Sequence, residues 1–227
     1  MGETYFMNVL IACEESQRIC KAFRQKGCNA FSCDLFEPSG GVLEWHIKGN
    51  ALDIINGGFF NTMDNKKYFV SRWDLIIAHP PCTYLSKAGA CRLYPVKGLV
   101  DPCRYSKGLQ AKEFFMKIYN ANCSYICIEN PTPLKIFELP KPTQIIQPYQ
   151  FGEPYSKRTL LWLKGLPKLK PTKIITEHIP YISCGTSKIR VLKKSKGFQE
   201  VGGSSKVRSL TFEGIALAMA EQWSKIL

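Results

Sequence analysis

Residues 73–82 read WDLIIAHPPC, and this stretch decides the fold. A short apolar run that stops at two prolines is typical of a strand buried on both faces of a parallel sheet, because proline cannot continue the sheet's hydrogen bonding. Similar runs occur at NVLIA (residues 8–12), NAFSC (29–33) and SYICI (124–128). They alternate with helical patterns, which predicts an α/β fold with a mainly parallel sheet.

The segments between these runs have helical periodicity. One helix is expected to end at Lys26, before Gly27, and two others to span residues 107–120 and 210–226. Residues 144–147 and 159–163 are strand-like and could form an antiparallel edge of the sheet. A loop rich in glycine, proline and tyrosine covers residues 83–103, and its length suggests a functional lid.

The chain has 227 residues, a net charge of +13 and a hydrophobic content of 45%. This composition is typical of one globular domain and excludes disordered, collagen-like and small disulfide-stapled proteins. No apolar run approaches the roughly 20 residues of a membrane helix, and the first residues carry no secretory pattern. The ten cysteines include no C-x-x-C pair and the three histidines are isolated. We therefore expect a cytoplasmic protein with reduced thiols, no metal site and no membrane association.

The positive charge is concentrated in one part of the chain. Residues 157–208 contain 13 Lys and Arg but only two acids, Glu177 and Glu200. A segment of this kind suits a polyanion, because each neutralised phosphate releases a counterion. The alternative interpretation is a lysine-rich surface that serves only solubility.

Polar or nucleophilic residues follow four of the expected strands: Glu14, Asp34, Cys82 and Glu129. Ligands of α/β proteins bind at the carboxyl ends of the strands, so these side chains mark a candidate site. The chain has neither a G-x-G-x-x-G nor a P-loop motif. Asp34 could hold the two hydroxyls of a ribose, although an Asp that caps a helix is nearly as common.

Cys82 follows a buried strand and two prolines, a rigid position that suits a nucleophile. A free cysteine is more often a small buried hydrophobe, and taken alone that interpretation would be favoured. Glu129-Asn130-Pro131 at the end of the next strand changes this balance. An acid can hold a ring while a thiolate adds to it, so the pair indicates covalent catalysis.

Six motifs occur in order: VLIACEES, CDL, AHPPCTYLS, YICIENP, QFGEPYSKRTLLWLKGLP and FEGIALAMAEQW. Together they resemble the cytosine-5 DNA methyltransferases, and most closely the short phage- and virus-type members. The resemblance covers about residues 8–223. It implies a Rossmann-like class I methyltransferase sandwich with a mainly parallel seven-stranded sheet, an antiparallel edge and a small basic recognition segment. It also implies S-adenosyl-L-methionine as cofactor and, for a viral member, a place in the host cytoplasm.

By this resemblance Cys82 adds to carbon-6 of a cytosine that has left the duplex, and carbon-5 becomes nucleophilic toward the methyl group. Glu129 holds and protonates the ring at N3, and Asn130 orients the turn. A basic residue, Lys157 or Arg158, contacts the base or the loop that closes over it; which of the two does so stays open.

The resemblance assigns further residues to the cofactor and to DNA. Either Asn50 or Asp53 would lie against the adenine. The cofactor-binding residues are Ile11, Ala12, Cys13, Glu14, Ser16, Asp34, Leu35, Asn50, Asp53 and Pro81. The catalytic residues are Cys82, Glu129, Asn130 and Arg158. The DNA-binding residues are Ser86, Lys157, Lys188, Arg190, Lys193, Lys194 and Lys196.

We expect a catalytic domain formed by residues 1–166 and 208–227, a target-recognition segment at residues 167–207, and action as a monomer on double-stranded DNA. Two alternatives remain. An amino methyltransferase acting on cytosine N4 or adenine N6 would need an acid or amide before the prolines and an aromatic after them, and HPPC offers neither. A catalytically inactive nucleic-acid-binding protein would keep the fold and the basic segment.

Overall fold

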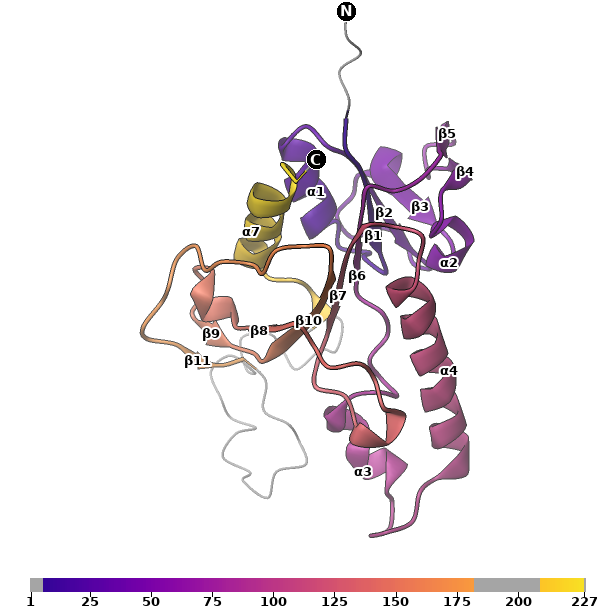
Figure 1. Cartoon of the computed structure of the whole chain (residues 1–227), viewed down its shortest axis with the longest axis vertical. Helices are drawn as coiled ribbons and strands as arrows, with labels where there is room; N and C mark the ends of the chain where they lie inside the picture. The colour runs from indigo at the N-terminus through magenta and orange to yellow at the C-terminus, as the bar shows by residue number, and fades with distance from the viewer. Residues whose placement is uncertain (1–5, 182–208, 227) are drawn as a thin grey trace, which may run out of the picture.

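The computed structural model describes residues 6–181 and 209–226 (Figure 1). Its main sheet has seven strands in the order β3-β2-β1-β6-β7-β10-β8. These strands are β1 (Asn8–Ala12), β2 (Asn29–Asp34), β3 (His46–Lys48), β6 (Leu75–Ala78), β7 (Tyr125–Asn130), β8 (Gln144–Ile146) and β10 (Thr159–Lys164). The helices are α1 (Arg18–Gln25), α2 (Ala51–Ile54), α3 (Ala90–Leu93), α4 (Pro102–Tyr119) and α7 (Glu213–Trp223). Short strands outside the main sheet are β4 (Gly58–Asn61), β5 (Lys67–Val70), β9 (Tyr155–Ser156) and β11 (Ile179–Pro180).

The sheet is parallel from β3 to β7. Leu10 of β1 lies between Phe31 of β2 and Ile76 of β6, each in parallel register. β10 runs antiparallel to both β7 and β8, so the antiparallel pairing lies at the β8 side of the sheet. This arrangement confirms the predicted fold class, a mainly parallel seven-stranded sheet of the Rossmann-like methyltransferase type with an antiparallel edge.

Helices cover both faces of the sheet. Val9 and Ile11 of β1 belong to a core with α1 and α7, whereas Leu10 and Ala12 belong to a second core that includes Phe115 of α4. Figure 1 shows α1 and α7 together on one side of the sheet and α4 on the other. Successive side chains of a strand point to opposite faces, so a strand buried on both faces must be apolar throughout. Each such side chain contributes about 1.5–3 kcal/mol of burial free energy.

Helix α4 begins five residues before the predicted start at residue 107. The carboxylate of Asp101 accepts a hydrogen bond from the backbone N–H of Arg104 at 2.6 Å, and Pro102 occupies the first helical position. An N-cap Asp followed by Pro is a strong start signal that outweighs weak periodicity in the first turn. The loop that follows Cys82 is therefore shorter than predicted, and it contains the short helix α3.

The sequence pattern did not predict the hairpin of β4 and β5. Phe60 and Val70 are buried on its inner side, and the Phe60 ring packs edge-on against Phe31 at a centroid distance of 5.0 Å. Phe59 and Phe69 point outward and are exposed. Because apolar side chains occupy both faces of the hairpin, the alternation that reveals a half-buried strand is absent.

Part of the predicted recognition segment packs against the body of the protein. Leu169 is buried, and both its backbone N–H and its carbonyl are hydrogen-bonded to the side-chain amide of Gln144, at 2.8 and 2.7 Å. Residues 182–207 lie outside the described residues, so the division at residues 166 and 167 stays a prediction. Within residues 6–181 and 209–226, no helix has the length and apolarity needed to cross a bilayer.

Gly214 allows the start of α7 to dock on the loop after β8. A Cβ at this position would overlap the backbone oxygen of Phe151, and backbone cannot yield as a flexible side chain can. Gly214→Ala should therefore lower the free energy of unfolding by about 2 kcal/mol, measured by urea denaturation. Gly49→Ala is the matched control, because its Cβ would meet nothing within 4 Å. Equal stability of the two variants would contradict this account of the docking.

Candidate active site

The carboxyl ends of β6 and β7 lie side by side and carry the two central residues of the candidate site. These strands pair in parallel, with Ala78 opposite Ile128, so the residues that follow each strand meet at the same edge of the sheet. Cys82 comes four residues after the end of β6, and Glu129 is the penultimate residue of β7. Neighbouring strands lie only about 5 Å apart, so the parallel pairing of β6 and β7 brings the thiol and the carboxylate together.

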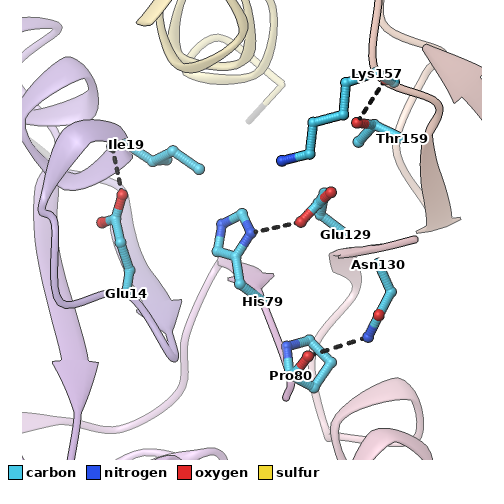
Figure 2. Close-up of polar contacts among 8 residues, drawn as sticks. All are labelled: Glu14, Ile19, His79, Pro80, Glu129, Asn130, Lys157 and Thr159. Atoms are coloured by element: carbon cyan, nitrogen blue, oxygen red, sulfur yellow. Dashed lines mark hydrogen bonds and ion pairs between the residues drawn. The ribbon is translucent and has the colours of Figure 1, made fainter. Parts of the chain in front are cut away.

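Asn130 holds the turn that carries Cys82. It is buried, and its side-chain amide donates a hydrogen bond to the carbonyl of Pro80 at 3.1 Å (Figure 2). On the other side of the thiol, the backbone N–H of Ser86 donates to the carbonyl of Cys82 at 3.0 Å. The structure thus places Asn130 where it can orient the turn, as the resemblance implies.

Glu129 is an ionised carboxylate held by two positively polarised groups. Its Oε2 lies 3.2 Å from Nδ1 of His79, and Figure 2 shows the Lys157 side chain pointing toward it. Burial by itself would raise the pKa of Glu129, but the hydrogen bond from His79 and the charge of Lys157 bring that pKa below its ordinary value. The carboxylate is therefore an acceptor at neutral pH.

The Cys82 thiol is half-buried and mostly protonated at neutral pH. Burial raises its pKa above the ordinary value, the negative charge of Glu129 raises it further, and the positive charge of Lys157 opposes both effects. The same cation thus acts on both the thiol and the carboxylate. A ligand that screens Cys82 from Glu129 would favour the thiolate, which is the nucleophilic form.

The structure distinguishes between the two basic residues of the candidate site. Lys157 is half-buried, and its Nζ lies over the rings of Tyr181 and Phe212 at 5.8 and 5.6 Å from their centroids. Its carbonyl accepts a hydrogen bond from Thr159 Oγ1 at 3.1 Å. Arg158 is exposed. Because Lys157 acts electrostatically on both Cys82 and Glu129, it is the cation that the fold directs into the site, and a catalytic role for Arg158 stays a prediction.

Replacing Lys157 tests this difference. Lys157→Met keeps the alkyl stem against the aromatic rings but removes the charge that favours the Cys82 thiolate. Its alkylation by iodoacetamide at pH 7.5, followed at Cys82 by peptide mass spectrometry, should slow about 3- to 10-fold. Arg158→Met is the matched control and should stay within about twofold of the wild-type rate. Equal slowing in both variants would show that the charge of Lys157 does not stabilise the Cys82 thiolate more than that of Arg158.

Five of the predicted cofactor-binding residues lie at the end of β1 and in the turn between β1 and α1. Ile11 and Ala12 are buried within β1, and Cys13 has a left-handed backbone with φ of 59°. Glu14 is only 3% exposed, and its two oxygens accept hydrogen bonds from the backbone N–H groups of Ile19 at 2.7 Å and Cys20 at 3.2 Å. Glu14 therefore caps helix α1 from inside the turn. Ser16 also lies in this turn and is half-buried.

The end of β2 fits the ribose and base of a nucleoside. Asp34 accepts a hydrogen bond from the backbone N–H of Phe36 at 3.0 Å, and a carboxylate has further lone pairs that can accept from a hydroxyl. Leu35 and Phe36 beside it are 68% and 71% exposed, an unusual exposure for large apolar side chains. A carboxylate that can accept from hydroxyls, next to exposed apolar surface, suits the predicted roles of Asp34 and Leu35 at a nucleoside, and both roles stay predictions.

Asn50 and Asp53 lie at α2, on the next strand crossover. Both are exposed, and Asn50 caps α2 by accepting a hydrogen bond from the backbone N–H of Leu52 at 3.1 Å. Part of the Asn50 side chain is thus committed to the helix, whereas the Asp53 carboxylate accepts no such hydrogen bond within residues 6–181 and 209–226. Both assignments stay predictions.

An open surface groove of about 400 Å³ lies beside Pro81 and extends along α4. A second groove of about 410 Å³ lies against α1 and Trp45, away from Cys82 and Glu129, and we give it no part in the chemistry. The residues that line the groove beside Pro81 are Tyr84, Lys107, Gln110, Ala111 and Phe114. The sequence did not predict these residues, because only the path of the loop before α4 brings them next to Pro81.

The predicted DNA-binding residues are only partly described. Ser86 is 5% exposed and bridges to Pro133, so in this structure it is a packed residue. Lys157 points into the site, as described above. The remaining five lie outside the described residues: Lys188, Arg190, Lys193, Lys194 and Lys196.

No protein-family model matches the chain. No curated protein matches it significantly. Among solved structures it is similar to the Entamoeba histolytica methyltransferase EhMeth, with 16% sequence identity and a TM-score of 0.41 over 81% of this chain and 62% of that one. The chain thus spans less than two thirds of that protein's length. The fold assignment rests on the chain's own strand order and not on this likeness.

Proposed function

We propose that this chain is a DNA (cytosine-5)-methyltransferase. It transfers a methyl group from S-adenosyl-L-methionine to carbon-5 of a flipped cytosine through a covalent adduct with Cys82. The observation that carries the proposal is the placement of Cys82 and Glu129 at adjacent strand ends, with Asn130 bonded to the Pro80 carbonyl between them. A thiol, an acid and a fixed turn at one edge of the sheet are the groups that addition to a pyrimidine requires.

The chemistry assigns one task to each residue. The Cys82 thiolate forms a bond to carbon-6, the C5–C6 electron pair moves to C4–C5, and the C4–N3 pair takes up a proton at N3. Glu129 is placed to hold that edge of the ring. The cofactor supplies the methyl group. The C4–C5 pair forms the bond to the methyl group, the C4–N3 double bond is restored, and the proton on N3 returns to Glu129. Loss of the carbon-5 proton to water then re-forms the C5–C6 double bond and expels the thiolate, so the enzyme ends the cycle unchanged.

Nucleoside mass spectrometry tests this proposal directly. DNA from a bacterial host without cytosine modification is digested after expression of the wild-type chain or its Cys82→Ala variant. We expect 5-methylcytosine only with the wild-type chain. A heavier cytosine adduct would keep the mechanism and change the donor, whereas methylated adenine, or 4-methylcytosine that survives Cys82→Ala, would identify an amino methyltransferase. No modified base, together with no transfer of label to DNA or RNA, would favour a binding protein.

The charge of residues 157–208 supports DNA as the partner. Each phosphate contact should add about 0.9 to the slope of log K against log salt, so contacts from four or five cations should weaken binding at least a hundredfold between 50 and 200 mM salt. Fluorescence anisotropy with a duplex oligonucleotide measures this. Lys193→Gln with Lys194→Gln should reduce the slope by about 2, and the control pair Lys66→Gln with Lys117→Gln should leave it unchanged. A slope near zero in the wild-type protein would exclude phosphate-driven binding.

A further inference from the structure

His79 is a buried imidazole that the proposed reaction does not yet use. Its side chain is 11% exposed and lies between two carboxylates, Glu129 and Glu14 (Figure 2). Nδ1 lies 3.2 Å from Oε2 of Glu129, whereas Nε2 is buried without a hydrogen-bond partner within the described part of the chain. A buried polar atom without a partner costs about 1–3 kcal/mol, so a residue kept only for packing would not be expected to be a histidine.

The contact with Glu129 fixes where the proton of the pair resides. The pKa of Glu129 lies below its ordinary value, and an ionised carboxylate can only accept. The hydrogen in the contact therefore belongs to Nδ1 of His79. The imidazole thus donates to the carboxylate next to the edge of the site that must supply a proton to the ring.

Charged groups face His79 from three elements. Glu129 comes from β7, Glu14 comes from the turn after β1, and Lys157 comes from the segment between β9 and β10 (Figure 2). Burial raises the pKa of Glu14, and the positive charge of His79 opposes that rise. Both carboxylates thus interact with the same imidazole. The charges that shift the pKa of Cys82 are those of Glu129 and Lys157. His79 shifts the pKa of Glu129 instead, so we assign it to the carboxylate and not to deprotonation of the thiol.

We propose that His79 is the positioning residue of Glu129 and the proton store of the site, an inference that rests on the proposed function. The stored proton is the second ring proton of His79, so Nε2 also carries a proton before the reaction begins. When Cys82 adds to carbon-6, the proton moves from Nδ1 of His79 to Oε2 of Glu129, and His79 is left as a neutral imidazole protonated on Nε2. At the same time the carboxyl group delivers a proton to N3. When the C4–C5 pair forms the bond to the methyl group, the N3 proton returns by the same route. No other reactant is required, because the proton lent to the ring comes back in each cycle.

The first test needs neither substrate nor cofactor. The protein is labelled with glutamate carrying ¹³C at the side-chain carboxyl, and the Glu129 signal is assigned by its loss in Glu129→Gln. The midpoint of its titration should rise by about 1–3 pH units in His79→Leu, because burial is then opposed by Lys157 alone. His178→Asn is the matched control, since His178 is exposed and stacks on Tyr149. An unchanged midpoint in His79→Leu would overturn the positioning role.

The second test separates proton storage from hydrogen bonding. His79→Asn keeps an N–H that can donate a hydrogen bond to Glu129, but an amide does not release a proton. If His79 stores the proton, His79→Asn should lose about 100-fold or more in kcat with KM for DNA within about threefold. A kcat near that of the wild type would overturn the proton store. If the wild-type chain makes no 5-methylcytosine, the proposed function is wrong, and the proposed proton transfer from His79 is wrong as well. The titration still shows in that case whether His79 lowers the pKa of Glu129. Should His79→Leu not fold, His79→Asn serves in both measurements.

Discussion

Cys82→Ser should lower the rate of methyl transfer by a factor on the order of 10⁴ or more while leaving the fold intact. A serine hydroxyl fills nearly the same volume but is far less nucleophilic and is not ionised at neutral pH, so the bond to carbon-6 cannot form at a useful rate. The measurement is single-turnover transfer of labelled methyl groups to a duplex oligonucleotide. Binding of DNA and cofactor by the variant should match that of the wild type.

A trapped adduct gives this prediction a second readout. In DNA that contains 5-fluorocytosine, carbon-5 has no proton to lose after methyl transfer, so the bond between Cys82 and carbon-6 should persist through denaturing electrophoresis. The adduct should form with wild-type protein and with Cys91→Ser, which changes an exposed cysteine outside the site. An adduct of equal yield with Cys82→Ser would show that another residue is the nucleophile.

Glu129→Gln should lower kcat by about 10²- to 10⁴-fold, the range expected for loss of a group that transfers a proton in the transition state. Glutamine keeps the shape and can still accept a hydrogen bond from His79, but it can neither take up nor deliver a proton. Steady-state kinetics with oligonucleotide substrate measure the effect.

Glu113→Gln provides the control for this change. Glu113 is exposed on α4 and pairs with Lys117, so its loss removes a carboxylate without touching the site. Its kcat should equal that of the wild type. If Glu129→Gln changed KM alone, Glu129 would bind the base without taking part in the proton transfer.

The strands could be predicted because the parallel sheet is buried on both faces. NVLIA at β1 and LIIA at β6 are apolar at every position, and such runs have few other structural explanations. Their ends were equally clear, because proline and charged residues stop them. The start of α4 was misplaced and the β4–β5 hairpin was missed, because neither has a regular alternation of apolar and polar residues.

The candidate site was only partly predictable. The sequence predicts a polar residue after each of two buried strands, and the parallel pairing of β6 and β7 makes Cys82 and Glu129 neighbours. The choice of Lys157 as the inward cation depends on how the segment between β9 and β10 packs against Tyr181 and Phe212, which are distant in sequence. No local pattern in the sequence reports that packing.

The sequence by itself determined the buried parallel strands, the approximate positions of the longer helices and the polar residues that follow β6 and end β7, because these follow from local apolar patterns and periodicity. Only the tertiary structure decided which polar groups face one another. His79 seemed an isolated histidine in the sequence, yet the fold places it between Glu14 and Glu129, which lie 65 and 50 residues away along the chain. Electrostatic coupling depends on distance in space and on burial, and both are fixed only when the strands and the turns between them have packed together.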